Sequence, residues 1–527
     1  MRKLLLASAA MLGGTMALVS VASAQTQVFT GVTAGGPPFP NIAAPGTAPF
    51  TGADYMSGPG FDNTANPGFG APLAPGNITV RLIGRMYFYF GVASDSGRNS
   101  PNVTPATVSA SLASGAVSTP NVQGNTKLAP YGAFEFSRLY PSFDGVAANG
   151  VKYGAFLEIR QDNQAAPGGG ANGSISGSGR ARGELYFRRE TTYIGTDQFG
   201  YLRVGATDQP TSLMMTGNFE NFDDGGWDGD PALVTGSTAP VWPYEDVGAW
   251  YTTTKMVYMS PKFANLIDFG VSFEPSTGTV GEDSTPGNCP YGVTSATGLE
   301  GPLIANESLG CDSASATNNA TEAGRRRNTF DGVVRLRTAA GPVGIAATIG
   351  TIQSGHVQYN GAVNYGTPTV GSTTVRYNGL DVLDFGLQFT FGGLAVGGHM
   401  MYGDFNGQGG LKPVGGTTSF APLVGASYTY GPNIIGFHAF DFESPGNWTQ
   451  ANGPYGVGKV RTEQGLAVGD TFTVAPGAYL LVTYLYGTRH QRGVDMLSGV
   501  NSSSSGFVKT NNNTRAQAIF AGTMFKW

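Results

Sequence analysis

The chain offers few residue patterns that could perform catalysis or hold a metal ion. Its histidines are His356, His399, His438 and His490, and no two of them have the His-x-x-x-His spacing of a zinc site. The segment Gly499-Val500-Asn501-Ser502 and similar serine-containing stretches lack the context of a nucleophile elbow, and no glycine pair precedes a helix that could hold a phosphate. We therefore expect no catalytic residues, no metal and no cofactor.

Two groups of charged residues could instead act on ions. The first group lies in the segment 207–248. Its residues 220–248 contain no lysine or arginine, and their carboxylates are Glu220, Asp223, Asp224, Asp228, Asp230, Glu245 and Asp246. The second group lies on stretches of alternating polarity and consists of Arg85, Arg138, Arg160 and Arg188. Rows of opposite charge that face each other across a narrow water-filled space create a transverse field, which orders polar solutes and hinders apolar ones. Such chemistry requires a fold that holds the two rows apart.

Composition narrows the fold class. Charged residues make up only 12% of the 527 residues and aromatic residues 11%, and glycine occurs 81 times. Glycine is costly inside helices, which argues against a helix bundle, whereas a disordered chain would be richer in charge and poorer in aromatic residues. The net charge of −5 offers no basic face for nucleic acid.

The N-terminus predicts export. Two basic residues precede an apolar stretch over 4–21, and Ala22-Ser23-Ala24 supplies a cleavage site, so residues 1–24 are predicted to be a signal peptide. A membrane-anchoring helix is the alternative. After Gln25 the sequence contains no run of 18 apolar residues and therefore no helical membrane span. If the mature chain crosses a bilayer, it must do so as a closed barrel.

Residues 25–77 are rich in proline and glycine without a regular period, and we predict a periplasmic tail or linker there. From Ile78 onward, apolar and polar residues alternate, as they do over 267–274 and 383–391. This alternation predicts strands with one apolar and one polar face. The predicted strands cover residues 78–92, 132–145, 149–162, 184–197, 199–206, 249–260, 263–275, 328–338, 341–352, 378–391, 393–405, 418–430, 432–443, 460–474, 477–489 and 514–527.

A β-sandwich would also satisfy the alternation, so the connections must decide between the two folds. Short turns alternate strictly with long polar loops, as an outer-membrane barrel requires, whereas a sandwich has no reason to keep its long loops at one end. We therefore predict an all-β fold over 78–527, namely a sixteen-stranded antiparallel transmembrane β-barrel with both termini on the periplasmic side. Phe525 and Trp527 end the last strand on its apolar face, which suits a membrane interface.

Several segments resemble, in order along the chain, those of the general porins of Gram-negative outer membranes. They are Ile83-Gly84-Arg85, Ser137–Gly145, Gly154–Glu158, Arg189–Gly195, Phe199–Gly205 and Met256–Phe263. Two positions depart from the family pattern, because Glu190 stands at an arginine position of the fourth strand and Ala206 stands where an arginine would follow the fifth-strand glycine. Charge selectivity therefore cannot be copied from the family.

The resemblance implies that residues 207–248 fold inward as a third loop and form a constriction. The basic wall opposite this loop would contain Arg85, Arg138, Arg160 and Arg188, with Lys152 and Glu158 also pointing inward. Because the loop carboxylates outnumber these cations, we expect a water-filled channel for passive diffusion of ions and small hydrophilic solutes, with weak cation selectivity. The alternatives are a substrate-selective channel for a sugar or an anion, and a structural or adhesive barrel.

The resemblance also implies a homotrimer in the outer membrane, in contact with lipid and lipopolysaccharide. Phe525 and Trp527 resemble the C-terminal signal that the barrel-assembly machinery reads. Cys289 and Cys311 both lie in the long loop 276–327. Because unpaired thiols are unusual in an oxidising compartment, we expect a disulfide between them.

Overall fold

The structure is a computed structural model. It describes residues 78–96, 130–162, 186–219, 239–244, 253–276, 326–356, 378–446, 460–492 and 512–527 apart from Asn265, Gln408 and Pro413, together with Phe222, Trp227 and Met496. The predicted signal peptide 1–24 and the predicted tail 25–77 lie outside the described residues.

The described residues form sixteen strands and the short helix α3 (Pro210–Leu213). The strands are β1 (Ile78–Asp95), β2 (Tyr131–Val146), β3 (Lys152–Asp162), β4 (Tyr186–Thr196), β5 (Gly200–Thr207), β6 (Thr253–Met259), β7 (Ile267–Ser276), β8 (Arg326–Ala340), β9 (Val343–His356), β10 (Asp381–Phe391), β11 (Leu394–Asp404), β12 (Ser419–Tyr430), β13 (Asn433–Ser444), β14 (Arg461–Ala475), β15 (Ala478–His490) and β16 (Asn513–Lys526). Within the described residues, no helix is long and apolar enough to cross a membrane.

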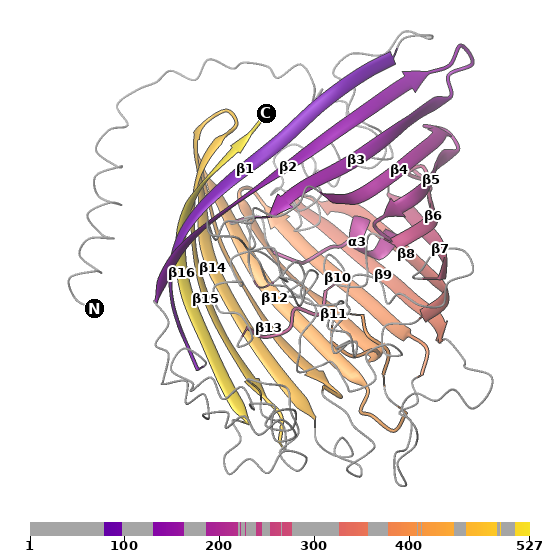
Figure 1. The fold of residues 1–527 in the computed structure, drawn as a ribbon. Coiled ribbons are helices and arrows are strands. Elements are labelled where there is room, and N and C mark those ends of the chain that lie inside the picture. The colour runs from indigo at the N-terminus through magenta and orange to yellow at the C-terminus, as the bar shows by residue number, and fades with distance from the viewer. Residues whose placement is uncertain are drawn as a thin grey trace, which may run out of the picture.

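The strands close into one antiparallel barrel, in which each strand pairs with its neighbours in sequence and β1 pairs with β16 (Figure 1). Closure leaves no strand edge with unpaired backbone groups, which is the condition for a sheet to lie in hydrocarbon. Strand number, order and closure confirm the predicted fold class. Strand ends differ from the prediction by a few residues. The third strand, for example, begins at Lys152 because Gly150, with a φ of 83°, belongs to the preceding turn.

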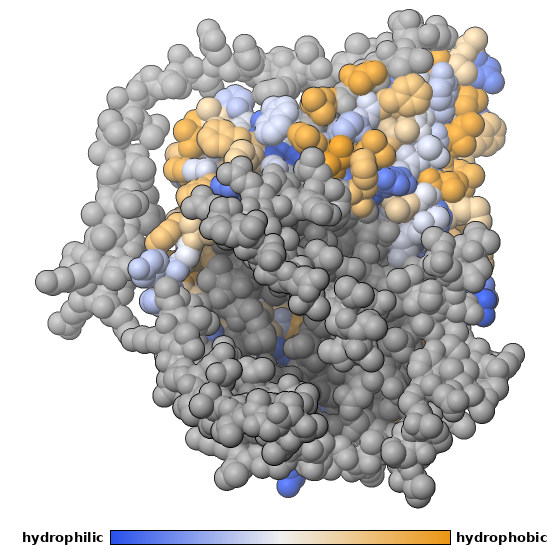
Figure 2. Space-filling model, viewed as in Figure 1, coloured by the Kyte–Doolittle hydropathy of each residue, from blue (hydrophilic) through white to orange (hydrophobic). Residues whose placement is uncertain are grey.

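Side chains alternate between the two faces of the barrel wall. In β10, Leu383 and Phe389 point outward and are exposed, whereas Val382 and Asp384 point inward and are buried. Figure 2 shows apolar side chains gathered on the outside over the strands at the top of the view. An outward apolar band and a polar interior are what a barrel surrounded by lipid requires.

The C-terminus is fastened to the first strand. Trp527 exchanges two backbone hydrogen bonds of 3.1 Å with Gly84 of β1, and its indole lies where a Cβ at Gly84 would be. Phe525 and Trp527 both lie on the outer face, with about half of each side chain exposed.

The two ends of the barrel differ in their connections. Seven connections are short and lie at one end, at residues 147–151, 197–199, 260–266, 341–342, 392–393, 431–432 and 476–477. We call this the short-turn end, and the start of β1 and the end of β16 lie there as well, because Ile78 pairs with Gly145 beside the first short turn. The long connections, including 208–252 and 277–325, leave from the opposite, long-loop end.

Candidate functional site

The connection between β5 and β6 folds back into the barrel, as predicted. Its first turn, α3, packs on the inner face of β7 and β8. The Thr211 amide donates a 3.1 Å hydrogen bond to Oδ1 of Asp331 on β8, and the Thr211 hydroxyl donates to Oδ2. Pro210 opens the helix at a position where its missing N–H is not needed. We call residues 207–244 the inner loop.

Two histidines of the wall hold the backbone of the inner loop. Nδ1 of His399 on β11 lies 3.1 Å from the carbonyl oxygen of Thr216, and Nδ1 of His438 on β13 lies 2.5 Å from that of Phe219. Nε2 of His399 lies 2.8 Å from Asp384 on the neighbouring strand β10, which fixes the orientation of the ring. Both histidines therefore have a positioning role in the wall. Among the described residues, no group of side chains has the arrangement of a metal site.

Further hydrogen bonds continue the inner loop across β14 and back to β12. They run from the Thr471 hydroxyl to Phe222 O (2.6 Å), from Trp227 Nε1 to Leu466 O (3.0 Å), from Val241 N to the Glu463 carboxylate, and from the Tyr244 hydroxyl to Ala421 O (3.3 Å). The loop is thus attached from β7 to β14, along one side of the interior.

Glycines of the wall make room for this attachment. A Cβ at Gly386, Gly425 or Gly436 would lie 2.2 Å from Thr216 O, 2.6 Å from the Phe219 ring or 2.4 Å from the Phe222 ring, respectively. Gly465 and Gly487 likewise leave space for Trp227. We call these five residues the glycine track. Any side chain there would push the inner loop toward the centre of the barrel.

Aromatic side chains pack the returning part of the inner loop against the same wall. The ring of Trp242 lies 4.6 Å from Tyr244, 5.0 Å from His438 and 5.2 Å from Phe440, measured between ring centroids, and all four side chains are buried. Edge-to-face pairs of this kind add to the stabilisation from buried area. The described residues of the inner loop are therefore packed into the interior.

The wall formed by β1 to β3 carries a row of arginines. Arg85 of β1 lies opposite Arg138 of β2, which lies opposite Arg160 of β3. Arg85 and Arg138 are buried on the inner face, and the guanidinium of Arg85 lies over the rings of Tyr87 (5.3 Å) and Tyr140 (5.9 Å). We call these three paired backbone positions the arginine row. The side chain of Arg160 is not among those described.

The next arginine of the interior is Arg189. Its guanidinium bonds Glu158 of β3 and lies 2.7 and 3.0 Å from Asp208, at the start of the inner loop. The sequence analysis selected Arg188 and overlooked both Arg189 and Asp208. The side chain of Arg188 is not described, and the register between β3 and β4 shifts beside it, between Glu158 and Ile159.

Elsewhere in the described interior, charged side chains form ion pairs. They include Lys255 with Glu274 (3.6 Å), Arg335 and Arg337 with Asp268 (2.8 and 2.7 Å), and Arg461 and Arg489 with Glu463. A closed barrel with an apolar outside, a charged inside and one loop fixed across that inside has the design of a channel through a membrane.

The sequence itself decides the family, because residues 68–492 match the Gram-negative porin family. The chain belongs to this family. As a porin it is a channel of the outer membrane, and the inner loop is the loop that the resemblance placed inside the barrel.

Two solved structures of outer-membrane channels align with most of this chain at low sequence identity. The anion-selective porin of Comamonas acidovorans is 13% identical, covers 86% of this chain and 100% of its own, and gives a TM-score of 0.45. The outer-membrane channel DcaP of Acinetobacter baumannii is 12% identical and covers 86% of this porin and 99% of its own chain, with a TM-score of 0.42. No curated protein sequence matches the porin.

Several predicted site residues of the porin lie outside the described residues. They are the loop carboxylates Glu220, Asp223, Asp224, Asp228, Asp230, Glu245 and Asp246, and the cysteines Cys289 and Cys311. Described residues that flank Asp223 and Asp224 in the sequence are attached to the wall. They are Phe219 and Phe222 before these carboxylates and Trp227 after them.

Proposed function

We propose that this porin forms a water-filled channel through which ions and small hydrophilic solutes diffuse passively. The observation that supports this function best is the inner loop, which is attached along β7 to β14 and faces the arginine row on β1 to β3. A loop attached along one side of a closed barrel narrows the interior. A polar constriction admits hydrated ions and excludes apolar molecules.

We further propose weak cation selectivity. A one-to-one ion pair such as Lys255 with Glu274 cancels locally, and we take the arginine row and the carboxylates of the inner loop as the two groups that act across the interior. The loop carries more carboxylates from residue 220 onward than the row carries arginines, and the excess negative charge raises the local concentration of cations. Arg189 does not change this balance, because Glu158 and Asp208 bind it.

Conductance of single molecules in a planar bilayer tests the proposal. We expect discrete steps and a reversal potential in a KCl gradient that indicates preference for potassium. Steps that a particular sugar or anion blocks at low concentration would favour a substrate-selective channel. A folded barrel that gives no steps would favour a structural or adhesive role and contradict the proposal.

We also propose that residues 1–24 are a signal peptide that directs export of the porin and is then cleaved. The barrel-assembly machinery would insert the exported chain into the outer membrane. Phe525 and Trp527 support insertion in this way, because both are outward aromatic residues at the end of the last strand. Assembly into a homotrimer, among lipid and lipopolysaccharide, completes this proposal. Crosslinking in intact membranes, which yields trimers for a trimeric porin, tests the oligomeric state.

The first prediction concerns orientation. If the long-loop end faces the medium, protease added to intact cells will cut within 277–325 and 491–512, and the segment 25–77 will be protected. Mass spectrometry of the released peptides identifies the cut sites, and permeabilised cells serve as the control in which the tail becomes accessible. Release of tail peptides from intact cells would show the opposite orientation.

The second prediction concerns Cys289 and Cys311. We expect a disulfide that closes a loop of about twenty residues, which would stabilise this segment by about 3 kcal/mol in the chain-entropy model. Because both cysteines lie outside the strands, reduction should leave the barrel folded and its conductance steps intact. Thiol labelling of denatured, unreduced protein is the measurement, and labelling of both cysteines would refute the disulfide.

A further inference from the structure

The inner wall is hydrophobic where the last strands of the barrel meet the first. Five large inward side chains of β1, β15 and β16 are fully buried, namely Tyr87, Tyr89, Leu481, Phe520 and Met524. Met524 is opposed to Tyr87 in the register, and Gly522 is opposed to both Tyr89 and Leu481, so these side chains are neighbours. We call the five residues the apolar patch.

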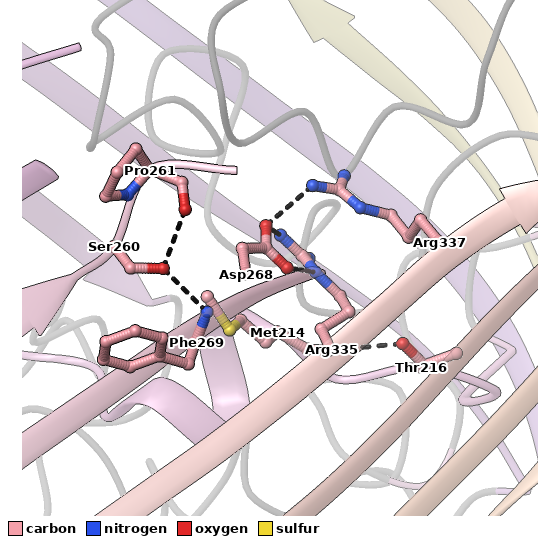
Figure 3. A network of polar contacts seen from close by, with 8 residues as sticks. All are labelled: Met214, Thr216, Ser260, Pro261, Asp268, Phe269, Arg335 and Arg337. Carbon is pink, nitrogen blue, oxygen red and sulfur yellow. Dashed lines mark hydrogen bonds and ion pairs between the residues drawn. The ribbon is translucent and has the colours of Figure 1, made fainter. Parts of the chain in front are cut away.

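The apolar patch differs from other parts of the inner wall. On β7 and β8 the inner face is charged, and Asp268 binds Arg335 and Arg337 there (Figure 3). A water-filled barrel has a polar inner surface, because water in contact with large hydrophobic side chains is unfavourable. A hydrophobic patch inside such a barrel therefore requires a segment that covers it.

Two aromatic rings of the apolar patch lie along the wall. A Cβ at Gly91 would lie 2.4 Å from the Phe520 ring, and a Cβ at Gly522 would lie 2.5 Å from the Tyr89 ring. A ring that lies along the wall turns one face to the wall and the other face to the interior. Because both rings are fully buried, other atoms must pack over them from the interior side.

The described attachments of the inner loop lie farther round the barrel. They run from β7 to β14, and on β15 a Cβ at Gly487 would lie 2.9 Å from Trp227. Gly487 is six residues from Leu481, or about 20 Å along a strand, toward the long-loop end. The buried cluster that includes the apolar patch also includes Phe219 of the inner loop. A second segment beside the inner loop would therefore continue the same lining.

The segment 50–77 has a composition that suits the apolar patch. It contains Phe50, Tyr55, Phe61 and Phe69 together with four prolines, and its only charged side chains are two aspartates. Pro-rich segments dock well on aromatic surfaces, because they lose little conformational entropy when they become ordered. A linker that only remained in water would be poor in aromatic residues.

The segment also joins the barrel at the correct place. Ile78 begins β1 at the short-turn end, and Tyr87 and Tyr89 lie on this same strand. The 28 residues of the segment span about 90 Å when fully extended, about three times the hydrocarbon thickness of a bilayer. Pro75-Gly76-Asn77 supplies turn residues for a reversal of the chain into the barrel.

We propose that residues 50–77 fold back into the barrel from the short-turn end and pack on the apolar patch. The inner loop then lines the channel along β7 to β14, and the segment lines it along β15, β16 and β1. The docking itself does not require conduction, whereas its effect on the current rests on the proposed function. Residues 25–49 stay in the periplasm and remain the part of the tail that protease reaches in permeabilised cells.

Protease protection of the full mature porin in detergent tests the docking. We expect proteinase K to remove residues 25–49 and to leave 50–77 on the folded barrel, which mass spectrometry of the new N-terminus measures. Phe61→Ser with Phe69→Ser should speed cleavage within 50–77 about a hundredfold, because each buried phenyl group contributes roughly a factor of ten.

The matched control for this variant is Phe29→Ser with Phe39→Ser, which removes two phenyl groups from the other half of the tail. This control should be cleaved like the wild type. Wild-type protein that is cleaved within 50–77 as fast as the Phe61→Ser, Phe69→Ser variant would overturn the inference. Heat-dependent gel migration shows that each barrel is folded.

Crosslinking locates the segment. In a porin with Cys289→Ser and Cys311→Ser, a short thiol crosslinker should join Phe69→Cys to Phe520→Cys within one chain. It should not join Phe69→Cys to Ile519→Cys, whose side chain lies on the outer face and is about half exposed. A crosslink to position 519 alone would place the segment outside the barrel, and a crosslink between two chains would assign the patch to a second copy. Either result, or no crosslink at all, would overturn the inference.

Conductance of the same proteins separates the docking from the channel function. We expect Phe61→Ser with Phe69→Ser to conduct more than the matched control, because release of the segment widens the interior. An unchanged current after loss of protection would show that the segment does not line the channel, against the inference. Protection and the inward crosslink without conductance steps would support the docking and contradict the channel. Conductance steps with neither protection nor crosslink would overturn the docking and leave the channel standing.

Discussion

Replacing Gly386 by valine is expected to move the inner loop away from the wall and to change single-channel conductance more than any other single substitution in the glycine track. The first atom of any side chain there would lie 2.2 Å from Thr216 O and 2.5 Å from the Thr348 hydroxyl. A backbone carbonyl cannot turn aside as a side chain can, so the contact opposes attachment by about 1–3 kcal/mol, the usual range for overpacking. The His399 bond to the same carbonyl should be lost with it.

Conductance of single channels measures this effect. A loop held off the wall at one attachment should give a variable, noisy open current instead of one steady level. Gly132→Val is the matched control, because a Cβ at this strand glycine would meet nothing within 4 Å. Both variants should keep the heat-dependent gel migration of a folded barrel. A steady, wild-type current from folded Gly386→Val would show that the inner loop does not control conduction.

The barrel could be predicted because its determinants are local. Strand alternation depends on neighbouring residues such as Val382 and Leu383, and turns depend on residues such as Gly150, whose positive φ ends the hairpin. Membrane barrels also need even strand number and one-sided long loops, and the sequence shows both features directly.

The sequence analysis missed Arg189 as an inward arginine for a physical reason. Phe187 and Ile194 are both outward and exposed, yet they are seven residues apart, which strict alternation forbids. One extra residue must therefore interrupt the strand, and the register shift between Glu158 and Ile159 accounts for it. Counting back in steps of two from the inward Tyr193 reaches Thr191 and then Arg189, and it would have selected Arg189 as an inward arginine.

The attachment of the inner loop could not be predicted from local sequence. His438 binds the carbonyl of Phe219, which lies 219 residues earlier in the chain, and Thr471 binds that of Phe222 at a separation of 249 residues. Every residue has a backbone carbonyl, so no sequence pattern marks a particular one as the hydrogen-bond acceptor of a distant side chain. The role of the glycine track could not be predicted from the sequence either, because its residues resemble the many other glycines of the strands.

Exchanging Asp223 and Asp224 for asparagine is expected to shift the reversal potential of the channel toward anions. The change removes two of the carboxylates that should make the constriction net negative, and it leaves side-chain volume nearly constant. Arg85→Gln should shift the reversal potential toward cations, because it removes one charge of the opposing arginine row. Measurement in a KCl gradient of dilute salt gives both signs in one experiment.

Ionic strength supplies the control for this mechanism. The Debye length is about 10 Å at 0.1 M and about 3 Å at 1 M, so charges that act across an aqueous constriction should lose most of their influence in concentrated electrolyte. Both shifts should therefore shrink together as salt rises. A change in loop position would instead alter conductance at every salt concentration. If Asp223→Asn with Asp224→Asn leaves the reversal potential unchanged even in dilute salt, these carboxylates do not face the conduction path, and cation selectivity must have another origin.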